Sequence, residues 1–239
     1  MTVDAAISAA FDRVSARQRD AMRAFTPGAT PENDDVAGKT TAQFTLDPLS
    51  VVPPEGDYFV VSGQRGTRAY TRDGSMAIRD GRLVDASGQP VLGSMHDGGT
   101  LAPIRIDPID LALHRCDDLR IDADGSLAYQ RTTIDPRTGA RIAERVIAGR
   151  LALARFPAGT VPVREDALHA EAPQGVLPHV GLAGDGAFGA LLPMHRNGAS
   201  IDIDAGLTKL REAYLALDAL RAARTADGSV AKTTMDLLK

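Results

Sequence analysis

The chain has 239 residues and a formal net charge of -4 at pH 7, with 27 Lys and Arg against 31 Asp and Glu and an aromatic content of only 4%. The two signs of charge are interspersed, which argues against a nucleic-acid partner or an anionic membrane surface, and the scarcity of aromatic side chains argues against base stacking. The single cysteine, Cys116, can form neither an internal disulfide nor a cysteine-based zinc site, and we expect a buried or half-buried thiol.

Residues 1–25 are predicted to form an N-terminal helix. Their apolar side chains recur at helical spacing, beginning with Val3, Ile7, Phe11 and Val14. Asp4 and Asp12 interrupt the apolar pattern, so we expect neither a secretory signal peptide nor a membrane span. Residues 26–55 begin with Pro, Gly and acidic residues and are predicted to be a linker.

Residues 56–157 are predicted to form an antiparallel β domain. Short apolar runs alternate with Asp-Gly, Ser-Gly and Thr-Gly pairs, which favour tight hairpins because Gly and Asp tolerate a positive φ. In "TTIDPRTGARI", Pro136 presets the turn and Gly139 supplies a left-handed position, which predicts two antiparallel strands around it. Residues 158–200 are rich in Gly, Pro and His, and are predicted to be an extended return segment.

Residues 201–239 are predicted to form a C-terminal helix with a heptad-like seam. The seam includes Leu207, Leu210, Tyr214 and Leu217. A terminal helix is not stable alone in water, so each must bury its apolar side. We expect the two helices to pair with each other, with the β domain or with neighbouring copies. On the first reading, the four N-terminal apolar residues meet the four seam residues across a helix interface.

No motif in the sequence supports catalysis, a cofactor or a metal ion. "GDGAFG", residues 184–189, has the spacing of a dinucleotide fingerprint, but Pro193 interrupts the helix that should follow. "DADG", residues 122–125, starts like a calcium loop but lacks the closing acidic residue, and a β-turn is expected. The five histidines show no ligand spacing and are expected at the surface or in packing. We therefore predict no catalytic, cofactor-binding or metal-binding residues.

The segment "GDYFVVSGQRGTRAYTRDGSMAIRDGRLVDASGQPVLG", residues 56–93, resembles the signature of the bacterial flagellar rod and hook family. In that signature a strand of the type "G-x-x-F-x-V" leads into "YTRDGSF" and then "G-x-LV-x-x-x-G-x-PVLG". "DGGTLAPIRID", "LRIDADGSLAY" and "IAGRLALARF" are similar to later segments of that family, and "DGAFGALLPMHRNGAS" is similar to the segment before its C-terminal helix. The family usually carries an "NNLANxxTxGFK"-like segment after its first helix, where this chain has "RDAMRAFTPGATPENDD". The length and the "GGTLAPI" stretch favour the proximal-rod FlgF type over the distal-rod FlgG type.

The resemblance implies a mainly β protein of rod and hook type whose terminal helices form a coiled-coil-like pair. It implies a self-assembling subunit of the basal-body rod, a torque-transmitting tube in the periplasm, built with other rod and hook proteins and exported by the flagellar type III apparatus without a cleaved signal. Two alternatives stay open: a non-polymerising accessory or binding protein of the flagellar system, in which the helix contacts hold one monomer together, and an enzyme whose pocket gathers residues from distant turns.

Overall fold

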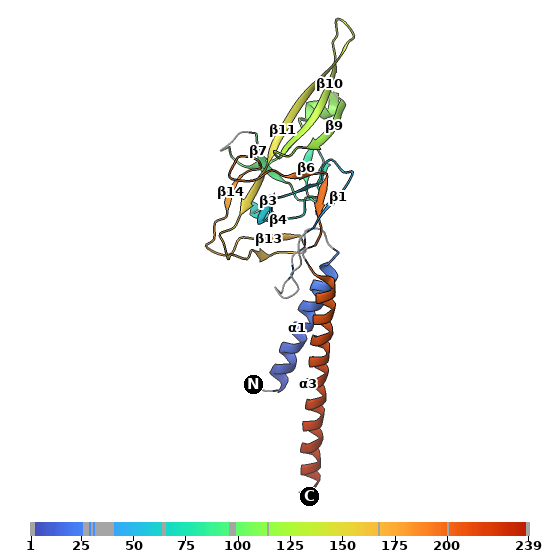
Figure 1. The fold of residues 1–239 in the computed structure, drawn as a ribbon, viewed down its shortest axis with the longest axis vertical. Coiled ribbons are helices and arrows are strands. Elements are labelled where there is room, and N and C mark those ends of the chain that lie inside the picture. Colours follow the sequence, from blue (N-terminus) through green and yellow to red (C-terminus); the bar gives the residue numbers. More distant parts are fainter. Residues whose placement is uncertain are drawn as a thin grey trace. The chain divides into compact units, whose positions relative to one another are not determined.

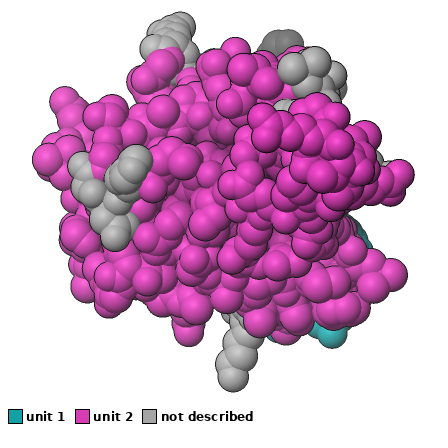
Figure 2. Space-filling view, turned by 90° about the horizontal axis from the view of Figure 1, so that it is seen from above, with its two compact units in different colours: residues 1–40, 199–239 teal, residues 41–198 magenta. Residues whose placement is uncertain are grey.

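The computed structural model describes residues 3–25, 29, 31, 41–63, 66–95, 99–113, 115–166, 168–199 and 201–237, and only the backbone at 111–113, 115 and 227–237. The chain forms two compact units. We call residues 1–40 and 199–239 the helix unit, and residues 41–198 the β unit (Figures 1 and 2). Each is described by itself.

The helix unit contains α1 (Val3–Arg23) and α3 (Ile203–Leu237), which lie side by side (Figure 1). Asp202 caps α3, because its Oδ1 accepts a hydrogen bond of 3.0 Å from the amide of Ala205. The two helices run antiparallel, since Asp4 near the start of α1 pairs with Arg224 far along α3 at 3.3 Å. An antiparallel pair lets each helix bury its apolar side against the other.

The β unit is built on a ten-stranded sheet with the order β12-β13-β4-β3-β11-β10-β9, in which β14 and β7 also pair with β11, and β8 pairs with β7. Two-stranded ribbons are formed by β1 and β16, by β15 and β2, and by β5 and β6. The strand pairs are antiparallel. This confirms the predicted fold class, mainly antiparallel β with N- and C-terminal helices.

The elements of the β unit are β1 (Ala42–Phe44), β2 (Val51–Val52), β3 (Asp57–Ser62), β4 (Arg68–Thr71), β5 (Ala77–Arg79), β6 (Arg82–Val84), β7 (Leu92–Ser94), β8 (Ala102–Pro103), α2 (Pro108–Leu113), β9 (Arg115–Ile121), β10 (Ser126–Ile134), β11 (Arg141–Arg155), β12 (Val163–Arg164), β13 (His169–Glu171), β14 (His179–Leu182), β15 (Leu192–Pro193) and β16 (His195–Asn197). The predicted return segment, residues 158–200, thus includes the five short strands β12 to β16.

The central strands of the sheet are buried on both faces. In β11, Leu151 and Leu153 belong to the larger apolar cluster, while Ala152 and Ala154 belong to a second cluster on the opposite face. Val60 in β3 likewise faces the second cluster, between two residues that face the first. Successive side chains of a strand point to opposite faces. The sheet therefore carries apolar packing on both sides, as a rigid block requires.

Asp-Gly pairs make tight turns, as their spacing predicts. Asp80 and Gly81 join β5 to β6 with φ values of 51° and 71°, so both central residues are left-handed, as in a type I′ turn. The hairpin expected at "TTIDPRTGARI" is β10–β11, in which Ile134 pairs with Arg141. This hairpin extends away from the rest of the β unit (Figure 1). Local turn chemistry determines both connections.

Two polar contacts join separate parts of the β unit. Asp57 in β3 is fully buried and accepts from Arg155 in β11, at 2.6 Å from Nε and 2.8 Å from Nη2. The Tyr129 hydroxyl in β10 donates to the buried Asp110 carboxylate, which attaches the short α2 to the sheet. Burial first, and then this hydrogen bond, raise the pKa of Tyr129.

Candidate functional site

Half of the predicted helix-interface residues pack inside the helix unit. Val14 in α1 and Leu217 in α3 are buried together with Ala10, and Ile7 and Leu210 pack against them. These residues share the side of each helix that faces the other, because they recur at spacings of three, four or seven. The contacts join the two helices of a single chain.

The other half of the predicted interface is exposed. The exposed fractions are 37% for Val3, 54% for both Phe11 and Leu207, and 44% for Tyr214. Large apolar side chains so exposed on a helix are unusual when they occur as a set rather than singly. Of the contacts expected from the sequence, those with neighbouring copies would be made by exposed side chains of this kind.

Three of these exposed side chains share one face of the helix pair with Met22 and Ile203, whereas Val3 lies on the packed side of α1. At about 100° per residue, Phe11 and Met22 lie roughly 70–90° round α1 from the centre of its packed side. Leu207 and Tyr214, together with Ile203, lie roughly 60–100° round α3 from its own packed side, in the same rotational sense. In an antiparallel pair, equal rotation in the same sense brings both sets to one common face. We call these five residues the apolar stripe.

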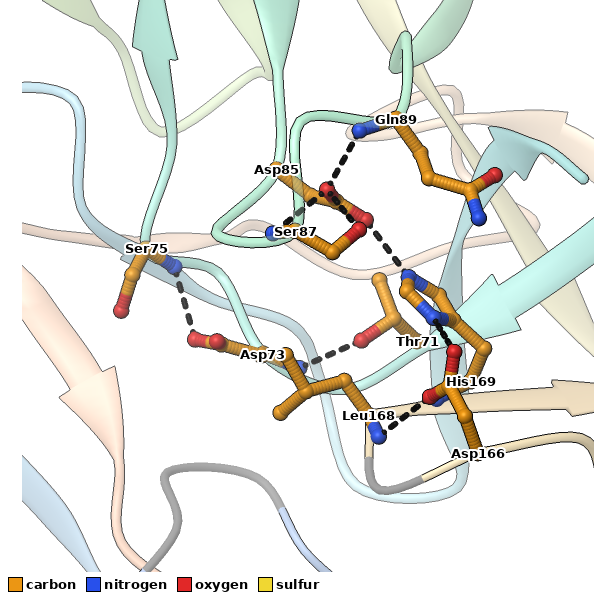
Figure 3. A network of polar contacts seen from close by, with 9 residues as sticks. All are labelled: Thr71, Asp73, Ser75, Asp85, Ser87, Gln89, Asp166, Leu168 and His169. Atoms are coloured by element: carbon orange, nitrogen blue, oxygen red, sulfur yellow. Dashed lines mark hydrogen bonds and ion pairs between the residues drawn. The ribbon is translucent and has the colours of Figure 1, made fainter.

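A polar network around the buried His169 links two turns of the β unit (Figure 3). The His169 side chain, fully buried in β13, lies with Nε2 2.6 Å from Asp85 Oδ2 and Nδ1 2.7 Å from Asp166 Oδ2. Asp85 Oδ1 also accepts hydrogen bonds from the amides of Ser87 and Gln89 and from the Ser87 hydroxyl. We call Asp85, Asp166 and His169 the triad.

The geometry of the triad favours the imidazolium form of His169. Both ring nitrogens face carboxylate oxygens, and a carboxylate can only accept, so both nitrogens must donate. The hydrogen bond to Asp85 raises the pKa of His169 to about 9, against the effect of burial, and Asp166 adds to the increase. Burial alone would raise the pKa of Asp85 and of Asp166, but the hydrogen bonds from His169 and from neighbouring groups outweigh it and lower both.

The triad does not form the arrangement of a nucleophilic catalyst. A serine triad needs an imidazole nitrogen free to accept the hydroxyl proton, whereas both nitrogens of His169 donate to carboxylates and the Ser87 hydroxyl donates to Asp85. The thiol of Cys116 is half-buried, and burial, with the charges of Asp110 and Asp117, raises its pKa. A raised pKa keeps a cysteine in the thiol form, which is the poor nucleophile.

Sequence reasoning missed the triad, because it treated His169 as a surface or packing residue. Asp85 and His169 are 84 positions apart, and no local pattern connects them. The nearest signal was the Asp-Ala-Ser-Gly turn at residues 85–88, which marks a carboxylate that caps its own loop. Its distant partner becomes visible only once β13 pairs with β4.

The nucleotide-like and calcium-like motifs are turns of the backbone. In residues 184–189, the Asp185 carboxylate accepts from the amides of Leu182, Ala187 and Phe188, and no helix starts there. Residues 122–125 join β9 to β10, with the amide of Gly125 donating to Asp122 O. Within the described ranges, no three His, Cys, Asp or Glu side chains gather as metal ligands would.

One groove of the β unit has a volume of about 670 Å³. Its lining includes Arg68, Thr100, Leu101, His179 and Asp185. The carboxylate of Asp185 already holds three backbone amides, so it is occupied by its own turn.

Comparison with known proteins agrees with the resemblance of the β unit. Residues 55–129 match the family model of the flagellar hook protein FlgE/F/G D1 domain. No curated protein matches the chain. Among the described helices, none is both long and apolar enough to cross a membrane. The matched segment runs from just before β3 into β10 and covers about a third of the 239 residues. The model is common to FlgE, FlgF and FlgG, so the match supports the flagellar hook and rod family of structural proteins without choosing among its types.

Proposed function

We propose that this chain is a structural subunit of the flagellar basal-body rod, and that copies of it assemble through the apolar stripe of the helix unit. The observation that carries the proposal is that Phe11, Met22, Ile203, Leu207 and Tyr214 are exposed together on one face of a helix pair whose own core is already filled. An apolar face on a filled pair can be buried only against another surface. The match of residues 55–129 to a hook-protein domain supports a neighbour of the same kind.

In this proposal the two units have separate tasks. The helix unit supplies the contacts between copies, and the β unit supplies a block that resists deformation when the tube turns. Burial on both faces of the sheet and the pairing of the buried Asp57 with Arg155 support the second task, since close-packed cores transmit strain. Torque transmission follows if these blocks are stacked round a common axis.

The remaining features of the proposal rest on the family likeness. We propose the proximal-rod FlgF type, a position in the periplasmic part of the basal body, other rod and hook proteins as neighbours, and export by the flagellar apparatus. The coiled-coil character of the assembled helices belongs to the same proposal.

One observation favours a second candidate, a non-polymerising accessory protein of the flagellar system. Ile7, Val14, Leu210 and Leu217, half of the residues that could join copies, pack within one chain. A pair of helices that only holds a monomer together would use its seam in this way. The two candidates differ in whether the apolar stripe contacts another copy of the chain.

Self-association of the full-length chain, measured by sedimentation velocity over a range of concentrations, tests the proposal. Leu207→Glu places a charge in the apolar stripe, and Leu215→Glu is its matched control on the same helix. Leu215 is similarly exposed, at 62%, but lies on the side opposite the packed one. We expect wild type and Leu215→Glu to associate and Leu207→Glu to remain monomeric. A wild-type chain that stays monomeric would favour the accessory protein, and equal association of both variants would exclude the stripe as the interface.

A further inference from the structure

The β12–β13 hairpin has few apolar contacts with the rest of the β unit. Among the described residues of 157–178, only Ala172 belongs to an apolar cluster, and Val161, Val163 and Leu177 are exposed. β13 joins the sheet through two residue pairs with β4, His169 with Thr71 and Ala170 with Tyr70. Segments with so little buried apolar surface open at a lower free energy than the core does.

The triad supplies a further attachment. Asp85 lies in the turn after β6, while Asp166 and His169 belong to the turn and strand of the hairpin, so the imidazolium joins the hairpin to a separate loop. Asp166 Oδ1 accepts from the amides of Leu168 and His169, and its Oδ2 faces the ring. The same carboxylate therefore holds both the turn of the hairpin and the imidazolium.

We propose that the triad is a proton-dependent fastener: while the imidazole of His169 carries its second proton, the β12–β13 hairpin stays on the edge of β4, and loss of that proton opens the hairpin and uncovers the edge. A neutral imidazole donates from one nitrogen only. The lone pair of the other nitrogen would then face a carboxylate at 2.6 or 2.7 Å. Either the buried Asp85 loses its partner, or Asp166 turns away and releases the two amides of the hairpin turn.

The charged groups around the imidazole determine the direction of the effect. Asp85 and Asp166 face the ring, and the neutral Thr71 lies opposite it on β4. Burial raises the pKa of Asp73, with the charge of Asp85 adding to the effect, while the Ser75 hydrogen bonds and Arg196 oppose it. Asp85 and Asp166 both raise the pKa of the ring, against the effect of burial, so they favour the protonated form.

The pKa of His169 lies above the unfolded value of 6.5, so the stabilisation is complete below about 6.5 and is lost as the pH rises through about 9. The pKa values of Asp85 and Asp166 are lowered, so their contribution is present above the ordinary carboxyl range and lost when the pH falls below it. The hairpin is fastened between these limits.

The first test follows the histidine rings and backbone amides of the full-length wild-type protein by NMR through a pH titration. We expect the His169 ring to titrate near pH 9, and the amide signals of β13 and β4 to change with the same midpoint. Titration of His169 at or below about 6.5 would overturn the proposal, as would amides of β13 and β4 that do not respond when the ring loses its proton.

The second test is hydrogen exchange at neutral pH on His169→Gln, which places a neutral side chain of similar reach in the triad. His179→Gln is the matched control, because it makes the same change at an exposed position in β14. We expect exchange in β4 and β13 to be at least about tenfold faster in His169→Gln than in the wild type, with β10 and β11 unchanged. Unchanged exchange in β4 and β13, or equal acceleration across the β unit, would overturn the proposal. If His169→Gln does not fold, the wild-type titration decides.

Discussion

Leu217→Ala is expected to separate the helix pair while leaving the β unit folded. Leu217 is 2% exposed and lies in a cluster whose other buried members, among the residues whose side chains are described, are Ala10 and Val14. Buried Leu→Ala substitutions cost about 2–5 kcal/mol, and so small a cluster can partly close around the gap, which favours about 2–3 kcal/mol. At 1.4 kcal/mol for each factor of ten, the pairing equilibrium falls by about 30- to 150-fold.

Hydrogen exchange of the α1 amides in dilute, monomeric protein measures this effect. An isolated helix of this length is marginal in water, so the protection of α1 depends on its pairing with α3. The matched control is Leu215→Ala, which makes the same chemical change on the same helix at an exposed position. The control is expected to stay within about 0.5 kcal/mol of the wild type. Equal effects of the two substitutions, or unchanged protection of α1 in Leu217→Ala, would refute the packing argument.

Two further substitutions test the β unit by thermal unfolding. Arg155 is 45% exposed, so Arg155→Ala, which leaves the buried Asp57 carboxylate unpaired, is expected to cost about 1–3 kcal/mol. The double variant Asp57→Asn/Arg155→Ala is expected to recover part of the lost stability. If it does not, Arg155 stabilises the β unit mainly through other contacts. Gly74→Ala is expected to be strongly destabilising, because an added Cβ would lie 1.6 Å from the carbonyl oxygen of Val51. Its control is Gly206→Ala in α3, where the space is open and a gain of about 0.5–1 kcal/mol is expected, so equal effects would contradict the steric reasoning.

The fold class was predictable because its signals are local. The Asp80-Gly81 turn needs a residue that tolerates a left-handed φ at each central position. Two adjacent residues of the sequence are enough to predict it. The turn after Pro136 and the helical spacing of the terminal segments depend equally on near neighbours. Gly74 in the family signature gains a physical reason from the structure, the close approach of the Val51 backbone.

The candidate site was less predictable because its geometry depends on distant partners. Periodicity identified an apolar seam on α3, but only the pairing with α1 shows that Leu217 faces inward while Leu207 and Tyr214 face outward. The triad is a stronger case, since Asp85 and His169 meet only after β13 has paired with β4. Nothing next to His169 in the sequence indicated that it would be buried between two carboxylates.

The proposed place of this protein in the rod is tested most directly by quantitative mass spectrometry of hook–basal bodies purified from the source bacterium, together with a swimming assay of a deletion strain. A rod subunit is expected in several copies in each particle, and its deletion is expected to abolish motility, with Leu215→Glu restoring swimming and Leu207→Glu failing to do so. Absence of the chain from the purified particle, with motility intact in the deletion strain, would contradict the account.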